Sequence, residues 1–175
     1  REVYNRHNKK VVFIGKKNKI IQDQVFINNP YITFEKNEDT ISINLNRYKN
    51  FELEMKQLHH GIISRCNFYG YNPSNIYPDL IYTQDEENKI TNLLKLLPEN
   101  FICIEPHAKT SWTENKSLPF DKWQNIVNEL KKHKINIVQV SIPGLKLLDN
   151  VIDFRNKLSS FREYACLLKY CKLFL

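Results

Sequence analysis

The polar residues that follow one short apolar run have the side chains needed to hold a phosphate group. The run spans residues 101–105, and imidazole, hydroxyl and ammonium groups follow it at His107, Lys109, Thr110, Ser111 and Lys116. We expect a buried strand over the run and a helix from about Pro119, which makes the polar segment a loop leading to a helix N-terminus. Unpaired backbone N–H groups and the helix dipole favour an anion there, and lysines add positive charge. This pattern predicts a nucleotide or sugar-phosphate site.

Each of these residues also has a structural interpretation. Lys116 could be a solvated loop lysine, and Thr110 could cap the following helix. His107 could pack within the loop, and Lys109 could lie on the surface. The residue types alone do not decide between these roles and a binding site.

Composition indicates a folded chain with a preference for anionic partners. The 175 residues are 42% hydrophobic and 26% charged, which is typical of one globular domain or two small ones. The net charge of +7 favours nucleic acid, phosphorylated substrates or an anionic membrane surface. The basic residues are scattered, however. The sequence also lacks the alternation of arginine with aromatic residues that would indicate binding to single-stranded RNA. We therefore do not expect a nucleic-acid partner.

The residues that could bind a metal are not arranged to do so. None of the four cysteines forms a C-x-x-C pair, and no histidine lies at zinc-finger spacing from them. His59 and His60 are adjacent, so on a strand their side chains would point to opposite faces. We expect no metal site, and reduced, buried thiols in a cytosolic protein. The sequence shows no signal peptide and no long apolar run.

The first half of the chain has a mixed, irregular pattern. Short apolar or alternating runs predict strands at residues 10–14, 41–45 and 79–82, and residues 51–58 have a loosely helical spacing. Residues 1–10 have the pattern of the end of a helix that leads into a strand.

The second half alternates regularly between helices and strands. We expect a helix over residues 85–97 capped by Asp85, and a helix from the S-x-x-E capping box at Ser160 to about Lys172. Strands are expected at residues 101–105 and 135–140 and from Leu173 onward. This order predicts an α/β fold with a parallel sheet. We place a domain junction near residues 98–100, which gives domains at 1–99 and 100–175. Because the apolar stub at 173–175 looks like an unfinished strand, we expect a fragment or a truncation of a larger two-domain protein.

Four segments together resemble the motifs of one enzyme family. They are VFINNPYI at 25–32, CIEPHAKT at 103–110, Lys116 followed by Leu118, Pro119 and Trp123, and KLSSFREYACLLKYCKLFL at 157–175. Their order and spacing resemble the bacterial heptosyltransferases of glycosyltransferase family 9.

This resemblance implies a GT-B architecture of two Rossmann-like domains, both incomplete in this chain. It implies an inverting, metal-independent transfer of a sugar, such as heptose, from a nucleotide-sugar donor such as ADP-heptose to a lipopolysaccharide-type, glycan or lipid-linked acceptor. Thr110 and Lys116 would contact the donor phosphates, while His107, Lys109 and Ser111 would line the loop. No cofactor is implied, and the family's location is the cytoplasm, at the inner face of the membrane.

The chain departs from the family pattern in several places. It contains no Gly-Asp pair, which carries the family's catalytic base, so no catalytic residue is identified. It ends before the position of the family's D-x-G-x-x-H loop, and Ser117 stands next to Lys116 where the family has tryptophan. A non-catalytic Rossmann-like binding domain is therefore the alternative to a glycosyltransferase.

Overall fold

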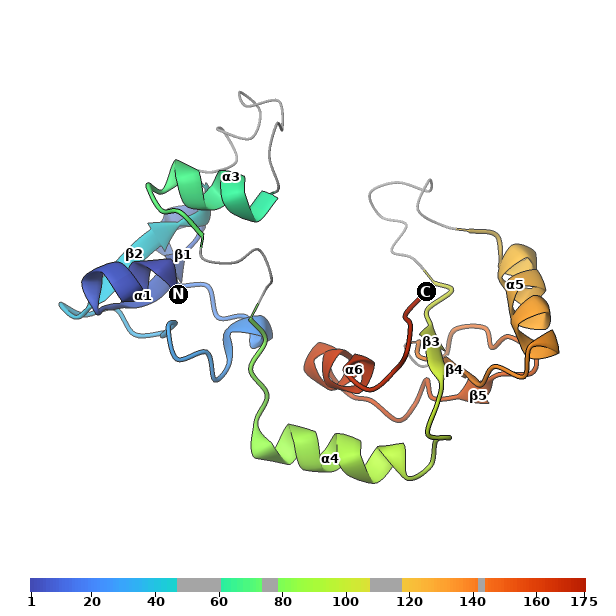
Figure 1. Ribbon diagram of the computed structural model, residues 1–175. Helices are drawn as coiled ribbons and strands as arrows, with labels where there is room; N and C mark the ends of the chain where they lie inside the picture. Colours follow the sequence, from blue (N-terminus) through green and yellow to red (C-terminus); the bar gives the residue numbers. More distant parts are fainter. Residues whose placement is uncertain (47–60, 74–78, 108–117, 142–143) are drawn as a thin grey trace. The chain divides into compact units, whose positions relative to one another are not determined.

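The computed structural model describes residues 1–46, 61–73, 79–107, 118–141 and 144–175, which divide into two units, Arg1–Ile81 and Tyr82–Leu175 (Figure 1). Both units are mixed α/β with parallel strands. None of the helices in the described part of the chain has the length and apolar character that a membrane span requires.

The first unit is built around a parallel strand pair. Its described elements are α1 (Glu2–His7), β1 (Lys10–Ile14), the 3₁₀ turns Lys16–Asn18 and Gln24–Phe26, β2 (Thr40–Asn44) and α3 (Gly61–Phe68). β1 pairs with β2 in a register that places Lys10 opposite Thr40 and Ile14 opposite Asn44. On its other edge, β1 forms an isolated parallel bridge between Val11 and Ile32.

The predictions for this unit are confirmed in part. The strand at 10–14 is present, the strand at 41–45 is present one residue earlier, and a helix precedes β1 as expected. The helix predicted at 51–58 lies outside the described residues. The strand predicted at 79–82 is wrong, because this segment leads directly into the cap of the next helix.

The second unit contains a parallel sheet with helices on both faces. Its elements are α4 (Gln84–Leu94), β3 (Ile102–Ile104), α5 (Phe120–Lys132), β4 (Ile137–Gln139), β5 (Ile152–Asp153) and α6 (Phe161–Leu168). β4 lies between β3 and β5, and all three strands are parallel. On the free edge of β3, residues 172–175 add a further parallel pairing through a bridge between Cys103 and Phe174. The strand expected from Leu173 is therefore present as this pairing.

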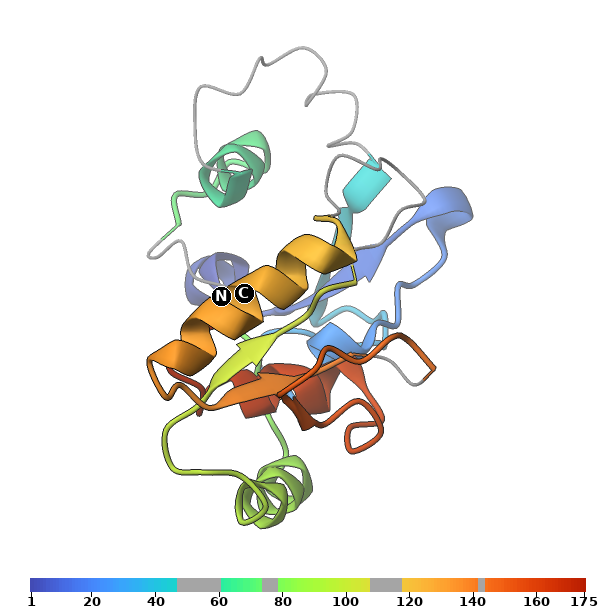
Figure 2. The same ribbon diagram turned by 90° about the vertical axis from the view of Figure 1, so that its right-hand side faces the viewer.

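Alternating side chains of the strands divide the core of this unit into two clusters. Cys103 and Val138 lie in one cluster with Ile90 of α4 and Cys166 and Leu167 of α6. The second cluster, on the opposite face, is made by Ile102, Ile104, Val127, Ile137 and Leu148, with Val127 supplied by α5. Figure 2 shows α5 lying across the sheet, with α6 behind it. This arrangement is the one expected when successive side chains of a buried strand alternate between faces.

The predicted helices of this unit are present, with changes at their ends. Thr83, not Asp85, caps α4: its Oγ1 accepts a hydrogen bond from the backbone N–H of Glu86 at 3.0 Å, and the Glu86 carboxylate accepts one from the N–H of Thr83 at 2.7 Å. Ser160 caps α6 as predicted, but the Glu163 carboxylate accepts from the N–H of Ser159 rather than from that of Ser160. α6 also ends at Leu168, short of the expected Lys172.

The division between the two units lies earlier than the junction expected near residues 98–100. It falls between Ile81 and Tyr82, so α4 belongs to the second unit. The reason is the packing of α4 on α6: Ile90 is fully buried beside Cys166 and Leu167, and Glu86 forms an ion pair with Arg162.

Candidate functional site

Of the five residues predicted to bind phosphate, the structure describes His107. Lys109, Thr110, Ser111 and Lys116 lie outside the described residues. His107 follows the carboxyl end of β3, and α5 begins after Pro119, as the strand–loop–helix pattern requires. The described residues therefore fix the two ends of the predicted loop.

The strand order changes direction at β3. Moving along the chain, the sheet grows from β3 to β4 and β5 on one side, and residues 172–175 then pair on the other side of β3. In open parallel sheets, ligands bind beyond the carboxyl ends of the strands at the point where the order reverses. The loop that begins at residue 105 lies at this point.

Glu105 connects the ends of three strands at this edge. Its Oε1 accepts hydrogen bonds from Ser141 Oγ, just beyond β4, at 2.9 Å and from the backbone N–H of His107 at 3.0 Å. Its own N–H donates to the carbonyl of Leu175 at 2.9 Å. Burial raises the pKa of the half-buried Glu105 carboxyl group, and the hydrogen bonds from His107 and Ser141 oppose this rise. Glu105 Oε2 has no hydrogen-bond partner among the described residues.

A buried polar layer supports Glu105 and the loop after β4. Tyr164 of α6 donates from its hydroxyl to the carbonyl of Ser141 at 2.8 Å. Gln139 is fully buried; its Nε2 donates to the carbonyl of Lys146 at 2.8 Å, and its Oε1 accepts from the N–H of Leu148 at 2.9 Å. Because every buried side-chain polar atom among the described residues has a partner, this layer holds its geometry without a ligand.

Burial also raises the pKa of Tyr164, and the neighbouring negative charge of Glu105 adds to the effect. The Tyr164 hydroxyl therefore remains a neutral hydrogen-bond donor to Ser141 over the physiological range.

The ring of His107 is held by its surroundings. Its Nε2 lies 3.0 Å from the carbonyl oxygen of Lys146, so this nitrogen carries the proton and donates it. The ring also stacks on Phe120, the first residue of α5, with centroids 5.7 Å apart and planes inclined by 26°. His107 is thus a packed loop histidine whose position ties the end of β3 to the start of α5.

The N-terminus of α5 carries a cation that the sequence did not indicate. Lys146 Nζ lies 4.4 Å from the centre of the Phe120 ring. Pro119 occupies the cap position and forms no side-chain capping hydrogen bond, while Asp121 provides one negative charge in the first turn. A lysine beside a helix N-terminus without a side-chain cap is a favourable place for an anion.

Sequence reasoning missed Glu105, Ser141, Lys146 and Tyr164 as members of this site. Glu105 was visible as a carboxylate directly after a buried strand, within the same segment as His107. The other three come from distant parts of the chain, and only the pairing of β3 with β4 and the packing of α6 bring them together.

The described residues contain no group of three or more His, Cys, Asp or Glu side chains that could hold a metal ion. The geometry instead combines a reversal of strand order, a helix N-terminus and a lysine near the carboxyl end of β3. Comparisons of the chain with protein-family models, with curated proteins and with solved structures found no match.

Proposed function

We propose that the second unit binds the diphosphate of a nucleotide sugar beyond the carboxyl end of β3. The observation that carries this proposal is the reversal of strand order at β3, next to the His107 loop and the N-terminus of α5. On this proposal the chain is the donor-binding part of an inverting, metal-independent glycosyltransferase with a GT-B architecture, similar to the heptosyltransferases. It would act in the cytoplasm, at the inner membrane.

The chemistry of sugar transfer suits such a site. As the bond between the anomeric carbon and the phosphate oxygen breaks, negative charge develops on the leaving nucleoside diphosphate. A helix N-terminus, the ammonium groups of Lys146 and Lys116 and the hydroxyls of Thr110 and Ser111 would stabilise this charge in place of a metal ion. The acceptor hydroxyl would attack the opposite face of the sugar and lose its proton to a base. The net charge of +7 suits an anionic glycan or lipid-linked acceptor.

Binding of ADP tests the proposal, with adenosine as the ligand that lacks phosphate. In isothermal titration calorimetry on the full chain, we expect ADP to bind and adenosine to bind at least about tenfold more weakly. Lys116→Ala and Lys146→Ala should each weaken ADP binding by about tenfold, because each removes a positive charge from the phosphates.

Lys131→Ala is the matched control, since Lys131 lies in the last turn of α5, at the end opposite the site. Equal affinity for ADP and adenosine, or ADP affinity that survives both lysine substitutions, would overturn the assignment. Tight ADP binding without sugar transfer to any supplied acceptor would instead favour the non-catalytic binding domain.

A further inference from the structure

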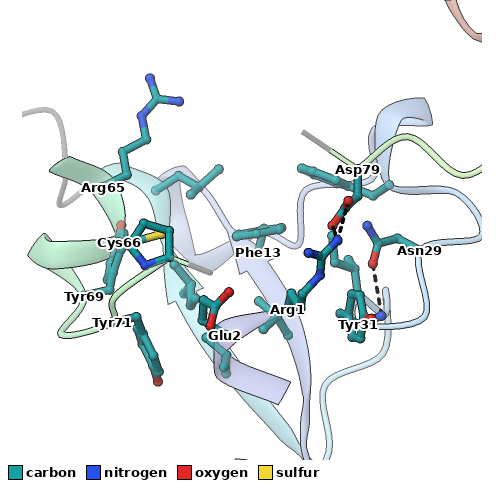
Figure 3. Close-up of a pocket in the computed structure, with 17 residues that line it drawn as sticks. Arg1, Glu2, Phe13, Asn29, Tyr31, Arg65, Cys66, Tyr69, Tyr71 and Asp79 are labelled. Carbon is teal, nitrogen blue, oxygen red and sulfur yellow. Dashed lines mark hydrogen bonds and ion pairs between the residues drawn. The ribbon is translucent and has the colours of Figure 1, made fainter. Parts of the chain in front are cut away.

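The first unit contains a partly open cavity (Figure 3). Its volume is about 420 Å³, and it is lined by residues of α1, β1, β2 and α3 and of the connecting segments. Ligand pockets for small molecules span roughly 300–1,000 Å³, so this cavity has room for a compact molecule. All of its lining residues belong to the first unit, and none belongs to the site at β3.

Aromatic rings make up much of the cavity wall. They are contributed by Phe13, Phe26, Tyr31, Tyr69 and Tyr71. The Phe13 and Phe26 rings lie 4.9 Å apart and pack against each other. Aliphatic side chains of the strand pair, including Val11 and Ile43, also line the cavity.

The polar groups of two of these rings are already engaged by the protein. The Tyr69 hydroxyl donates to the carbonyl of Asn44 at 2.8 Å, and the Tyr71 hydroxyl lies 3.2 Å from His7 Nε2. These tyrosines therefore present mainly ring carbon to the cavity. A wall of this kind offers few partners to water and favours an apolar occupant.

The charges around the cavity compensate one another. Arg1 forms an ion pair with Asp79 at 2.5 Å, and the remaining charged lining residues, Glu2 and Arg65, are of opposite sign. Figure 3 shows the Arg1–Asp79 pair on the side of Tyr31 and Asn29, away from Arg65. The four charged lining side chains sum to zero. Burial lowers the pKa of the Arg1 α-amino group, which disfavours its charged form, so the lining side chains select neither a cation nor an anion.

We propose that this cavity is a binding site for a small, neutral molecule that carries an aromatic ring. Aromatic ligands pack against such walls in edge-to-face and offset geometries, and they bury apolar surface without leaving a charge unpaired. The inference is independent of the function proposed for the second unit.

Protection of Cys66 tests the site in the unaltered chain, with indole as the probe. Cys66 lies on α3, is half-buried and lines the cavity, and burial raises the pKa of its thiol. Alkylation by iodoacetamide at mildly alkaline pH, followed by peptide mapping, reports its accessibility. With indole at about ten times its dissociation constant, we expect alkylation of Cys66 to slow by about tenfold.

Cys171 provides the internal control, because it is half-buried too but belongs to the second unit. Its alkylation rate should not change with indole. Unchanged alkylation of Cys66, or equal slowing at both thiols, would overturn the proposal.

A filled cavity supplies the second test. Cys66→Phe places a ring in the space, whereas Asn67→Phe puts the same ring on the next residue of α3, which is exposed and does not line the cavity. By calorimetry, we expect indole affinity to fall by about tenfold in Cys66→Phe and to stay unchanged in Asn67→Phe. If Cys66→Phe does not fold, the thiol-protection result on the unaltered chain decides alone.

Two further probes test the ligand class. Tetramethylammonium represents a cation suited to an aromatic cage, and octanoate represents an anionic acyl chain. Both should bind more weakly than indole. Affinity for either one equal to that for indole would overturn the neutral aromatic ligand.

Discussion

Glu105 is the residue that most directly joins the fold to the candidate site. Its carboxylate binds the Ser141 hydroxyl and the N–H of His107, so it holds the first residues of the predicted phosphate loop against β4. Its burial makes the ionised form unfavourable relative to an exposed carboxylate. The site therefore has a titratable group at its base.

We predict that the free energy of unfolding of Glu105→Gln, relative to that of wild type, increases as the pH rises. Since the folded-state pKa of Glu105 lies above its ordinary value of 4.5, the neutral acid is favoured in the folded state. The stability that protonated Glu105 contributes to the wild-type chain is fully present below pH 4.5, and it is lost as the pH rises through the folded-state pKa. Glutamine keeps an oxygen acceptor and does not titrate.

Denaturant unfolding of both chains between about pH 4 and about pH 8 measures this difference. Glu99→Gln removes the same charge from an exposed position and serves as the control. A stability difference between Glu105→Gln and wild type that stays constant over this pH range would contradict the burial argument.

At the residue scale, the sequence could predict a loop between a buried strand and a helix, but not the polar residues that surround the start of that loop. A run of His, Lys, Thr and Ser after a buried strand indicated an anion-binding loop. Whether His107 would bind a ligand or pack against the protein depended on Phe120 and on the carbonyl of Lys146, whose positions follow from tertiary structure. The polar partners of Glu105 were hidden for the same reason.

Among the elements, α4 and α6 show how one buried ion pair holds two helices. Arg162 Nε and Nη2 donate to the two Glu86 carboxylate oxygens at 2.5 and 2.7 Å, and the Arg162 side chain is only 3% exposed. The adjacent Glu87 pairs with Lys169 across the same two helices, but both side chains are about 40% exposed. The two pairs thus differ in burial and in geometry, because Arg162 makes two hydrogen bonds to Glu86 and Lys169 makes one to Glu87.

We predict that Glu86→Gln destabilises the chain by about 3 kcal/mol, because it takes the carboxylate from a buried guanidinium. Glu87→Gln should cost less than about 1 kcal/mol, since exposed pairs contribute little. Denaturant unfolding at neutral pH compares the two variants. Equal losses of unfolding free energy in the two variants would show that burial of an ion pair does not determine its contribution to stability.

The pH dependence provides a second check on Glu86. Hydrogen bonds from Arg162 lower the pKa of Glu86 below its ordinary value of 4.5. The stability that it contributes is therefore present above pH 4.5 and is lost as the pH falls through the folded-state pKa. Wild type should lose stability in acid more steeply than Glu86→Gln does.

Helices whose apolar residues repeat at helical spacing could be predicted from the sequence. Strands that are defined only by their pairing in the folded chain could not. α4, α5 and α6 each have an apolar stripe and a start signal, so they were found with small errors at their ends. β5 is only two residues long, and nothing in its local sequence distinguishes it from a loop. The strand predicted at 79–82 failed because short apolar runs do not say whether a partner strand is present.

At the scale of the molecule, the described residues divide into two units, Arg1–Ile81 and Tyr82–Leu175. Both apolar core clusters described for the second unit are made entirely of residues from Tyr82 onward. The alternation of strands and helices predicted a parallel sheet there, but not the order of its strands, because each new strand can join either edge. The division at Ile81 also depended on the packing of α4, which the sequence did not reveal.

We predict that a chain of residues 82–175 folds on its own. Its sheet, its helices and their core contacts all lie within that range, so removing the first unit takes away none of them. Its ¹H–¹⁵N correlation spectrum should reproduce the dispersed peaks of the second unit in the full chain. A narrow spectrum typical of an unfolded chain would show that this unit depends on the first.

The pairing of β3 with residues 172–175 has a consequence for the order in which the second unit can form during synthesis. β3, β4 and β5 leave the ribosome before residues 172–175, so the backbone N–H groups of Cys103 and Glu105 have no strand partner on that side until these later residues are made. Parallel pairing between distant segments is slow, and an open apolar strand edge can pair with other chains in the meantime. The nascent chain is therefore most exposed to misassembly at the strand that also begins the candidate site.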